Sequence, residues 1–346
     1  MANNNNSEIF LGQCFISDFQ RQITISLLSI FAIPSLICFL FVFYYLIKLR
    51  KRLLFDHINH HVILLILICD FLLILTELPI TIYYLARGNV ETRKICLFWI
   101  YWDYTLETTS LFLVMYVSIE RYCLVFLKRY LLKHRYLLHY IPMICLTIYI
   151  PILYLYLIVL SPCALNHPYD LTAFACGGAC FFKYTIVNTY DTIVDTMLPC
   201  FIILIFNLLL SIRVSLIKRR ALKSASLLTI LKRNRRMILQ SIGISLLSLI
   251  AWMPWVIIII VQNFFEASFG DWFITYILHY LPYLTTSMSP FLALIGLPEI
   301  QKHLKLSKYL LKTSTKSTDS IPTEQPMPIV CISKRSQSID VQITRL

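Results

Sequence analysis

The chain alternates long apolar stretches with short polar and basic segments. Seven apolar stretches are long enough to cross the ~30 Å hydrocarbon core of a bilayer. They lie near residues 23–47, 60–86, 95–127, 138–160, 190–216, 236–262 and 272–297. Backbone polar groups in lipid must be satisfied within their own segment, so each stretch should be a helix. The pattern therefore predicts an all-α membrane protein built as a bundle of seven transmembrane helices.

The segments that flank these stretches have different compositions. Residues 1–22 are polar, and we expect them to form an extracellular N-terminus before the transmembrane domain of residues 23–297. Leucine and lysine alternate through residues 298–312, which predicts a short amphipathic eighth helix on the inner membrane surface. Residues 313–346 are rich in Ser, Thr and Pro, which is typical of a disordered tail.

Composition and charge support a membrane protein. The chain is 58% hydrophobic and only 14% charged, whereas soluble domains carry about 25% charged residues. The net charge of +13 does not indicate nucleic-acid binding, because the basic residues lie between apolar stretches. Most of them fall in the loops at 48–52, 128–135 and 213–236. The positive-inside rule then predicts a multi-pass plasma-membrane protein with its N-terminus outside and its C-terminus inside.

The third stretch carries charges that a simple membrane anchor would lack. Asp103, Glu107, Glu120 and Arg121 all lie within it. At about 100° per residue, Asp103 and Arg121 are about five turns apart on one face of a helix. A charge at bilayer depth costs roughly 2.5 kcal/mol or more, so such residues usually face a bundle interior or a wet cavity. We expect this helix to be central, with a ligand at one end and a cytoplasmic partner at the other.

No enzyme site emerges from the residue patterns. The chain has no phosphate-binding Walker loop, no nucleophile elbow and no metal-binding motif of the HExxH type. The sequence CGGAC at residues 176–180 has only His167 as a nearby imidazole, which disfavours a metal site. We therefore predict a protein that is not an enzyme and that uses no metal or cofactor.

Several motifs, each in its expected stretch, resemble those of the rhodopsin-like family of G-protein-coupled receptors. Glu120-Arg121-Tyr122 stands where that family has its Asp/Glu-Arg-Tyr triplet, and Cys96 lies at the family's interval before the arginine. The other matching features are Asp70 in the second stretch, Pro199 in the fifth, Trp252-Met253-Pro254 in the sixth and Ser289-Pro290 in the seventh. The likeness covers roughly residues 23–312.

The resemblance implies roles for these residues. Glu120, Arg121 and Tyr122 would couple to a heterotrimeric G protein, with Arg121 paired to Glu120 until activation. Arrestin and a receptor kinase would be further partners. The activation switch would comprise Asp70, Trp252, Pro254, Ser289 and Pro290.

The resemblance also implies a disulfide from Cys96 to the loop after the fourth stretch. Cys176 and Cys180 both lie at a suitable distance, and we favour Cys180, which would leave Cys163 to pair with Cys176. Cys14 has no assigned partner. Asn5 begins an Asn-x-Ser glycosylation pattern on the predicted outer side.

The chain departs from the family pattern at several positions. The first stretch has no Asn, and the fourth has no Trp. Ser289 replaces the usual Asn of the seventh stretch, Ala293 replaces its Tyr, and Ala251 replaces the Cys that usually precedes Trp252. These differences indicate a divergent member.

The acidic residues suggest a ligand. Asp103 follows Cys96 by the interval at which amine and many peptide receptors of this family carry the acid that binds a ligand's ammonium group. In amine receptors a tyrosine at the position of Tyr283 supports that acid. Asp191 and Asp195 would share one helix face. The residues expected to bind the ligand are Asp103, Glu107, Asp191, Asp195, Trp252, Trp255, His279 and Tyr283. We expect a cationic amine or a peptide with a basic residue.

Three other functions are compatible with seven spans. A divergent chemosensory receptor would take another class of ligand. A seven-span ligand-gated channel of the odorant type would have the opposite orientation and would lack the Glu-Arg-Tyr triplet. A secondary transporter would usually show internal repeats, which this sequence lacks.

Overall fold

The computed structural model describes residues 18–49, 59–220, 225–266 and 268–297. Those residues form helices and connecting loops, with no strand among them. The predicted amphipathic helix at 298–312, the tail at 313–346, Asn5 and Cys14 lie outside the described residues.

Six helical segments of the described chain are long and apolar enough to cross a membrane. The first is α1 (Asp18–Lys48), and the third is α4 (Arg93–Phe126). The second is made of α2 (Asn59–Leu72), η2 (Leu73–Glu77) and α3 (Leu78–Arg87). The fourth is made of η3 (Tyr136–Tyr140), α6 (Ile141–Tyr154), η4 (Leu155–Leu160) and α7 (Pro162–Asn166). The fifth is made of α8 (Thr185–Tyr190), η7 (Asp191–Met197) and α9 (Leu198–Arg220), and the sixth lies within α10 (Ala225–Phe264).

The predicted seventh stretch is divided rather than continuous. It comprises α11 (Asp271–Tyr276), η9 (Leu278–Tyr280) and α12 (Leu281–Gly296). Helix α12 has 16 residues, fewer than the ~20 that cross a bilayer without tilt or distortion. Pro282 lies in its first turn and has no backbone N–H to continue a preceding helix. The chain therefore breaks immediately before α12.

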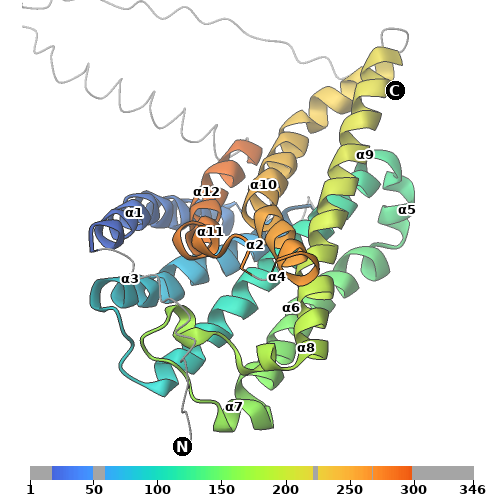
Figure 1. The fold of residues 1–346 in the computed structure, drawn as a ribbon. Helices are drawn as coiled ribbons and strands as arrows, with labels where there is room; N and C mark the ends of the chain where they lie inside the picture. The colour runs from blue at the N-terminus through green and yellow to red at the C-terminus, as the bar shows by residue number, and fades with distance from the viewer. Residues whose placement is uncertain (1–17, 50–58, 221–224, 267, 298–346) are drawn as a thin grey trace, which may run out of the picture. The chain divides into compact units, whose positions relative to one another are not determined.

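The third stretch is the central helix that its charges predicted. Helix α4 contacts α2, α6, α9 and α10, four elements that belong to four different spans (Figure 1). It begins at Thr92, whose side chain accepts a hydrogen bond from the backbone N–H of Ile95. Such a cap satisfies one of the free N–H groups at a helix start.

Burial in the bundle differs from that of a soluble protein, although its core is also largely apolar. Ile30, Ile33 and Ile37 on α1 are each more than 60% exposed. Glu120 and Arg121 are each only 2% exposed. Apolar side chains thus face outward, as lipid requires, and the charged groups face the interior.

Widened π-helical turns interrupt the second and fifth spans. The turn η2 directly precedes Leu78-Pro79, and η7 directly precedes Leu198-Pro199. Proline cannot donate to the carbonyl one turn before it, so the local ladder of hydrogen bonds must change there. Such turns shift the faces that the surrounding residues present. Both turns contain acidic residues of the site described below.

Candidate functional site

A cavity of about 360 Å³ opens between α4, η7, α10 and the start of α12. Pockets that bind small ligands typically measure about 300–1,000 Å³. Seven of the eight predicted ligand-binding residues line it: Asp103, Glu107, Asp191, Trp252, Trp255, His279 and Tyr283. The loop between the fourth and fifth spans also contributes, through Phe174 and Phe182.

The acidic groups of the cavity come from two different spans. Asp103 and Glu107 lie one turn apart on α4, and Asp191 belongs to η7. The hydroxyl of Tyr154 donates a hydrogen bond of 2.7 Å to Oδ1 of Asp191. The same hydroxyl lies 3.3 Å from Oγ1 of Thr108 on α4. Asp191 is therefore anchored toward the helix that carries the other two acids.

Asp195 does not lie where the sequence predicted. It is 1% exposed and is not among the residues that line the cavity. Neither of its carboxylate oxygens has a hydrogen-bond partner among the described residues. The sequence argument assumed an ordinary α-helix, in which residues four apart share a face. In the π-helical turn η7, Asp191 reaches the cavity lining and Asp195 does not.

Glu77 is a buried polar residue that the sequence analysis missed. It is fully buried, and its Oε1 accepts three hydrogen bonds: from Nε1 of Trp99 at 2.6 Å, from Oγ1 of Thr81 at 2.8 Å and from the hydroxyl of Tyr283 at 2.6 Å. Tyr283, expected to support Asp103, thus donates to Glu77. The signal was available, because an acid at bilayer depth is itself a functional candidate.

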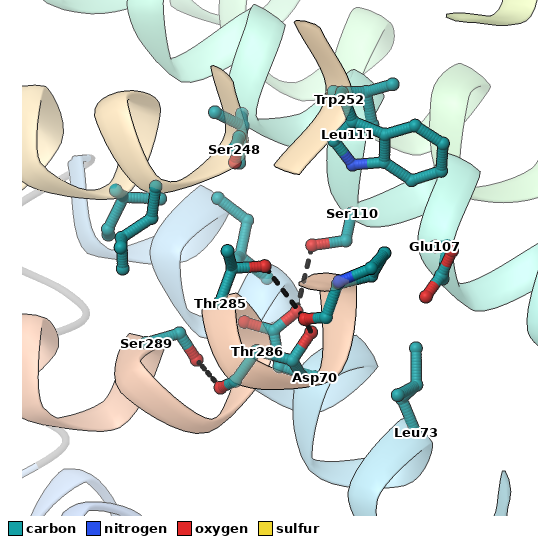
Figure 2. A pocket seen from close by; sticks show the side chains of 15 residues that line it. Asp70, Leu73, Glu107, Ser110, Leu111, Ser248, Trp252, Thr285, Thr286 and Ser289 are labelled. Carbon is teal, nitrogen blue, oxygen red and sulfur yellow. Dashed lines mark hydrogen bonds between the residues drawn. The ribbon is translucent and has the colours of Figure 1, made fainter. Parts of the chain in front are cut away.

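A smaller pocket of about 40 Å³ lies deeper in the bundle and surrounds Asp70. That volume is enough for about one water molecule. Figure 2 shows the hydroxyl of Ser110 turned toward Asp70, to whose Oδ1 it donates a hydrogen bond of 2.9 Å. Ser289 also lines this pocket and donates to the backbone oxygen of Thr286. Glu107 and Trp252 line both this pocket and the larger cavity. The two sites are therefore joined through those residues.

The triplet Glu120-Arg121-Tyr122 lies at the opposite end of α4. Glu120 and Arg121 are buried, while Tyr122 is half-buried and packs against Phe206 with ring centroids 5.6 Å apart. Nδ1 of His139 lies 2.7 Å from Oε1 of Glu120. An ionised carboxylate only accepts hydrogen bonds, so with Glu120 ionised the imidazole is the donor. This contact with the fourth span was not anticipated from the sequence.

The disulfides differ from the predicted pairing. Cys96 is bonded to Cys176, and Cys163 is bonded to Cys180. The preference for Cys180 as the partner of Cys96 was therefore wrong, and Cys176, the stated alternative, is correct. Both cysteines suit the spacing to Pro199, so the spacing could not separate them. The backbone decides, because a turn with positive φ at Ala175 and Cys176 folds this part of the loop back onto α4.

Hydrogen bonds within the same loop support that turn. The backbone N–H of Asp170 donates to the oxygen of Cys176 at 3.2 Å. The side-chain hydroxyl and backbone N–H of Thr172 donate to Oδ1 of Asp170, at 2.7 Å and 2.9 Å respectively. These two bonds favour the charged carboxylate and hold the pKa of Asp170 below its ordinary value.

The fold and the buried charges define a multi-pass helical membrane protein with an internal acidic cavity. A family model described as 7 transmembrane receptor (rhodopsin family) matches residues 50–292. That match spans more than half of the chain, and the protein belongs to this family of signalling receptors. The resemblance found in the sequence is thereby confirmed, and members of the family are receptors rather than enzymes. No curated protein matches the chain significantly.

Proposed function

We propose that this protein is a cell-surface receptor for a cationic ligand and that it activates a heterotrimeric G protein. The proposal of a cationic ligand rests on the acidic side chains of the cavity. Asp103, Glu107 and Asp191 line it, and the described lining contains no lysine or arginine. His279 is the basic side chain among those lining residues.

Electrostatics favours a cation in this cavity. Carboxylates that share a low-dielectric space repel one another, and a bound ammonium or guanidinium group relieves that repulsion. Asp103 is the proposed anchor, because the resemblance places it where amine receptors hold the ligand's ammonium. Glu107 lies one turn deeper on the same helix, and Asp191 approaches from the fifth span.

The size and lining of the cavity limit the ligand further. At roughly 30 Å³ for each water-sized group, a cavity of about 360 Å³ holds about a dozen non-hydrogen atoms. Tyr104, Phe182 and Trp255 supply aromatic faces, which attract cations as well as apolar groups. A small amine, or one basic side chain of a peptide, fits these properties.

The proposed signalling end is the triplet Glu120-Arg121-Tyr122 with the basic segment at 213–236. In this proposal the receptor lies in the plasma membrane with its N-terminus outside. Arrestin and a receptor kinase act on the cytoplasmic side. Arg121→Ala is expected to abolish nucleotide exchange on a reconstituted G protein while leaving ligand binding intact.

The decisive experiment is a ligand screen with paired variants. Libraries of amines and basic peptides would be tested on the wild type, on Asp103→Asn and on Asp170→Asn. Asp170 is a matched control, because this loop acid is not among the residues that line the cavity. Loss of potency only in Asp103→Asn is expected. An anionic or wholly apolar activating ligand, or unchanged potency in Asp103→Asn, would overturn the assignment.

A further inference from the structure

The imidazole of His139 links three spans at the signalling end of the bundle. Its Nδ1 lies 2.7 Å from Oε1 of Glu120 on α4, and its Nε2 lies 3.2 Å from Nδ1 of His61 on α2. His139 and Glu120 are 0% and 2% exposed. The turn that carries His139, η3, is itself bound to α4, because the hydroxyl of Tyr116 donates to the backbone oxygens of Leu138 and His139.

Both ring nitrogens of His139 are used, so the ring cannot turn without losing a contact. With Glu120 ionised, the nitrogen that faces it carries the hydrogen, because an ionised carboxylate only accepts. The second oxygen of Glu120, Oε2, has no hydrogen-bond partner among the described residues. His139 therefore supplies the hydrogen bond that fixes this carboxylate in the described structure.

The position of Glu120 matters for its neighbour. The guanidinium of Arg121 is buried, and the negative charge of Glu120 acts on it electrostatically. A buried cation is stable only while a compensating charge stays close. A carboxylate that moves away leaves Arg121 better stabilised by water on the cytoplasmic side. That side is where a signalling partner would meet it.

We propose that His139 is a positioning residue of the signalling triplet, which holds Glu120 in place and thereby keeps Arg121 buried in the resting receptor. Only the expected effect on nucleotide exchange rests on the proposed G-protein coupling. The structural part, that His139 controls the exposure of the triplet, stands independently of it.

Two substitutions of His139 distinguish loss of its hydrogen bond to Glu120 from the mere presence of a polar side chain at this position. In His139→Asn, the amide nitrogen stands near the place of Nδ1 and can still donate to Glu120. In His139→Gln, the amide nitrogen stands near the place of Nε2 and faces His61 instead. His134→Gln is a control, because it alters an exposed histidine that precedes the same turn.

The first measurement is basal nucleotide exchange by a reconstituted G protein. His139→Gln is expected to raise the basal exchange rate about tenfold, because losing one charge-assisted hydrogen bond shifts the equilibrium between buried and exposed Arg121 by about that factor. The rates of His139→Asn and His134→Gln are expected to stay within about twofold of wild type. If the receptor does drive exchange, equal rates in all variants, or equal increases in the Asn and Gln variants, would overturn the proposal. In a Glu120→Gln background, His139→Gln is expected to add nothing, and an additive increase would count against it.

The second measurement does not involve a G protein. Cys123 follows the triplet on α4 and is a half-buried free thiol. Its labelling rate, followed by peptide mapping, is expected to rise in His139→Gln and not in His139→Asn. If labelling separates the two variants but no receptor form drives exchange, the proposed coupling fails and the role of His139 stands. If labelling is the same in both variants, the role of His139 is refuted.

Discussion

The hydroxyl of Tyr283 donates a hydrogen bond of 2.6 Å to Oε1 of Glu77, and this bond joins the start of α12 to the widened turn η2 of the second span. Thr81 lies 3.0 Å from the same hydroxyl, and Trp99 donates to the same carboxylate oxygen. The second span, the third span and α12 therefore meet at one buried acid. Tyr283 and Glu77 connect the wall of the cavity to the interior of the bundle.

The bond between Glu77 and Tyr283 should contribute to stability. A hydrogen bond contributes about 0.5–1.5 kcal/mol, and a polar group left buried and unpaired costs about 1–3 kcal/mol. Tyr283→Phe and Glu77→Gln are therefore expected to lower the apparent unfolding temperature in detergent, and the double variant to lose less than the sum of the two. Tyr156→Phe alters an exposed tyrosine and serves as the control. Additive losses would show that the two side chains are not coupled.

The anchor of Asp191 gives a second prediction. Tyr154→Phe removes the hydroxyl that donates to Asp191 Oδ1 and leaves the ring in place. We expect it to weaken binding of a cationic ligand by about tenfold, and Asp191→Asn to weaken it at least as much. Tyr149→Phe is a matched control on the same helix. The hydroxyl of Tyr149 lies 2.7 Å from the hydroxyl of Tyr190, so this variant removes a contact with another tyrosine and not one with an acid. The test is a binding isotherm for an agonist found in the screen.

The disulfide pairing is directly testable. Non-reducing peptide mapping is expected to recover Cys96 linked to Cys176 and Cys163 linked to Cys180. Loss of such a bond typically costs about 2–5 kcal/mol, so Cys176→Ser should reduce the folded, surface-expressed fraction sharply. Cys145→Ser alters an exposed free thiol and should have no such effect. Recovery of a peptide that links Cys96 to Cys180 would refute the assignment.

The loop between the fourth and fifth spans should respond to acid through Asp170. Its pKa is lower in the folded protein than its ordinary value of 3.8, because the two donors of Thr172 favour the charged form. A group with a depressed folded pKa stabilises the fold above its unfolded pKa, and that contribution disappears as pH falls through the folded pKa. We therefore expect Asp170→Asn to be slightly less stable than wild type near pH 7, and this difference to disappear as pH falls below ~4. The effect should be small, since the group is largely exposed to solvent. Thermal unfolding from neutral to acidic pH measures it, and identical pH profiles for the two proteins would contradict the prediction.

The sequence by itself determined that the protein is a bundle of membrane-spanning helices, and it identified the acidic residues that line the cavity. Long apolar stretches are a local property, so the second stretch at 60–86 agrees closely with the span that runs from Asn59 to Arg87. A charged residue such as Asp103 or Arg121 within such a stretch is tolerated only in the interior of the bundle. This conclusion can be reached without knowing which residue it contacts there. The interval from Cys96 to Arg121 depends only on one helix.

Only the tertiary structure decided which groups meet. The π-helical turn η7 places Asp191 at the cavity and Asp195 away from it, and a periodicity of 3.6 residues cannot express that difference. The pairing of Cys96 with Cys176 depends on a positive-φ turn in a loop. The contacts of Glu77 with Tyr283 and of Glu120 with His139 join different spans. Partners across a bundle are set by helix rotation and depth, which packing determines and which one stretch of sequence does not contain.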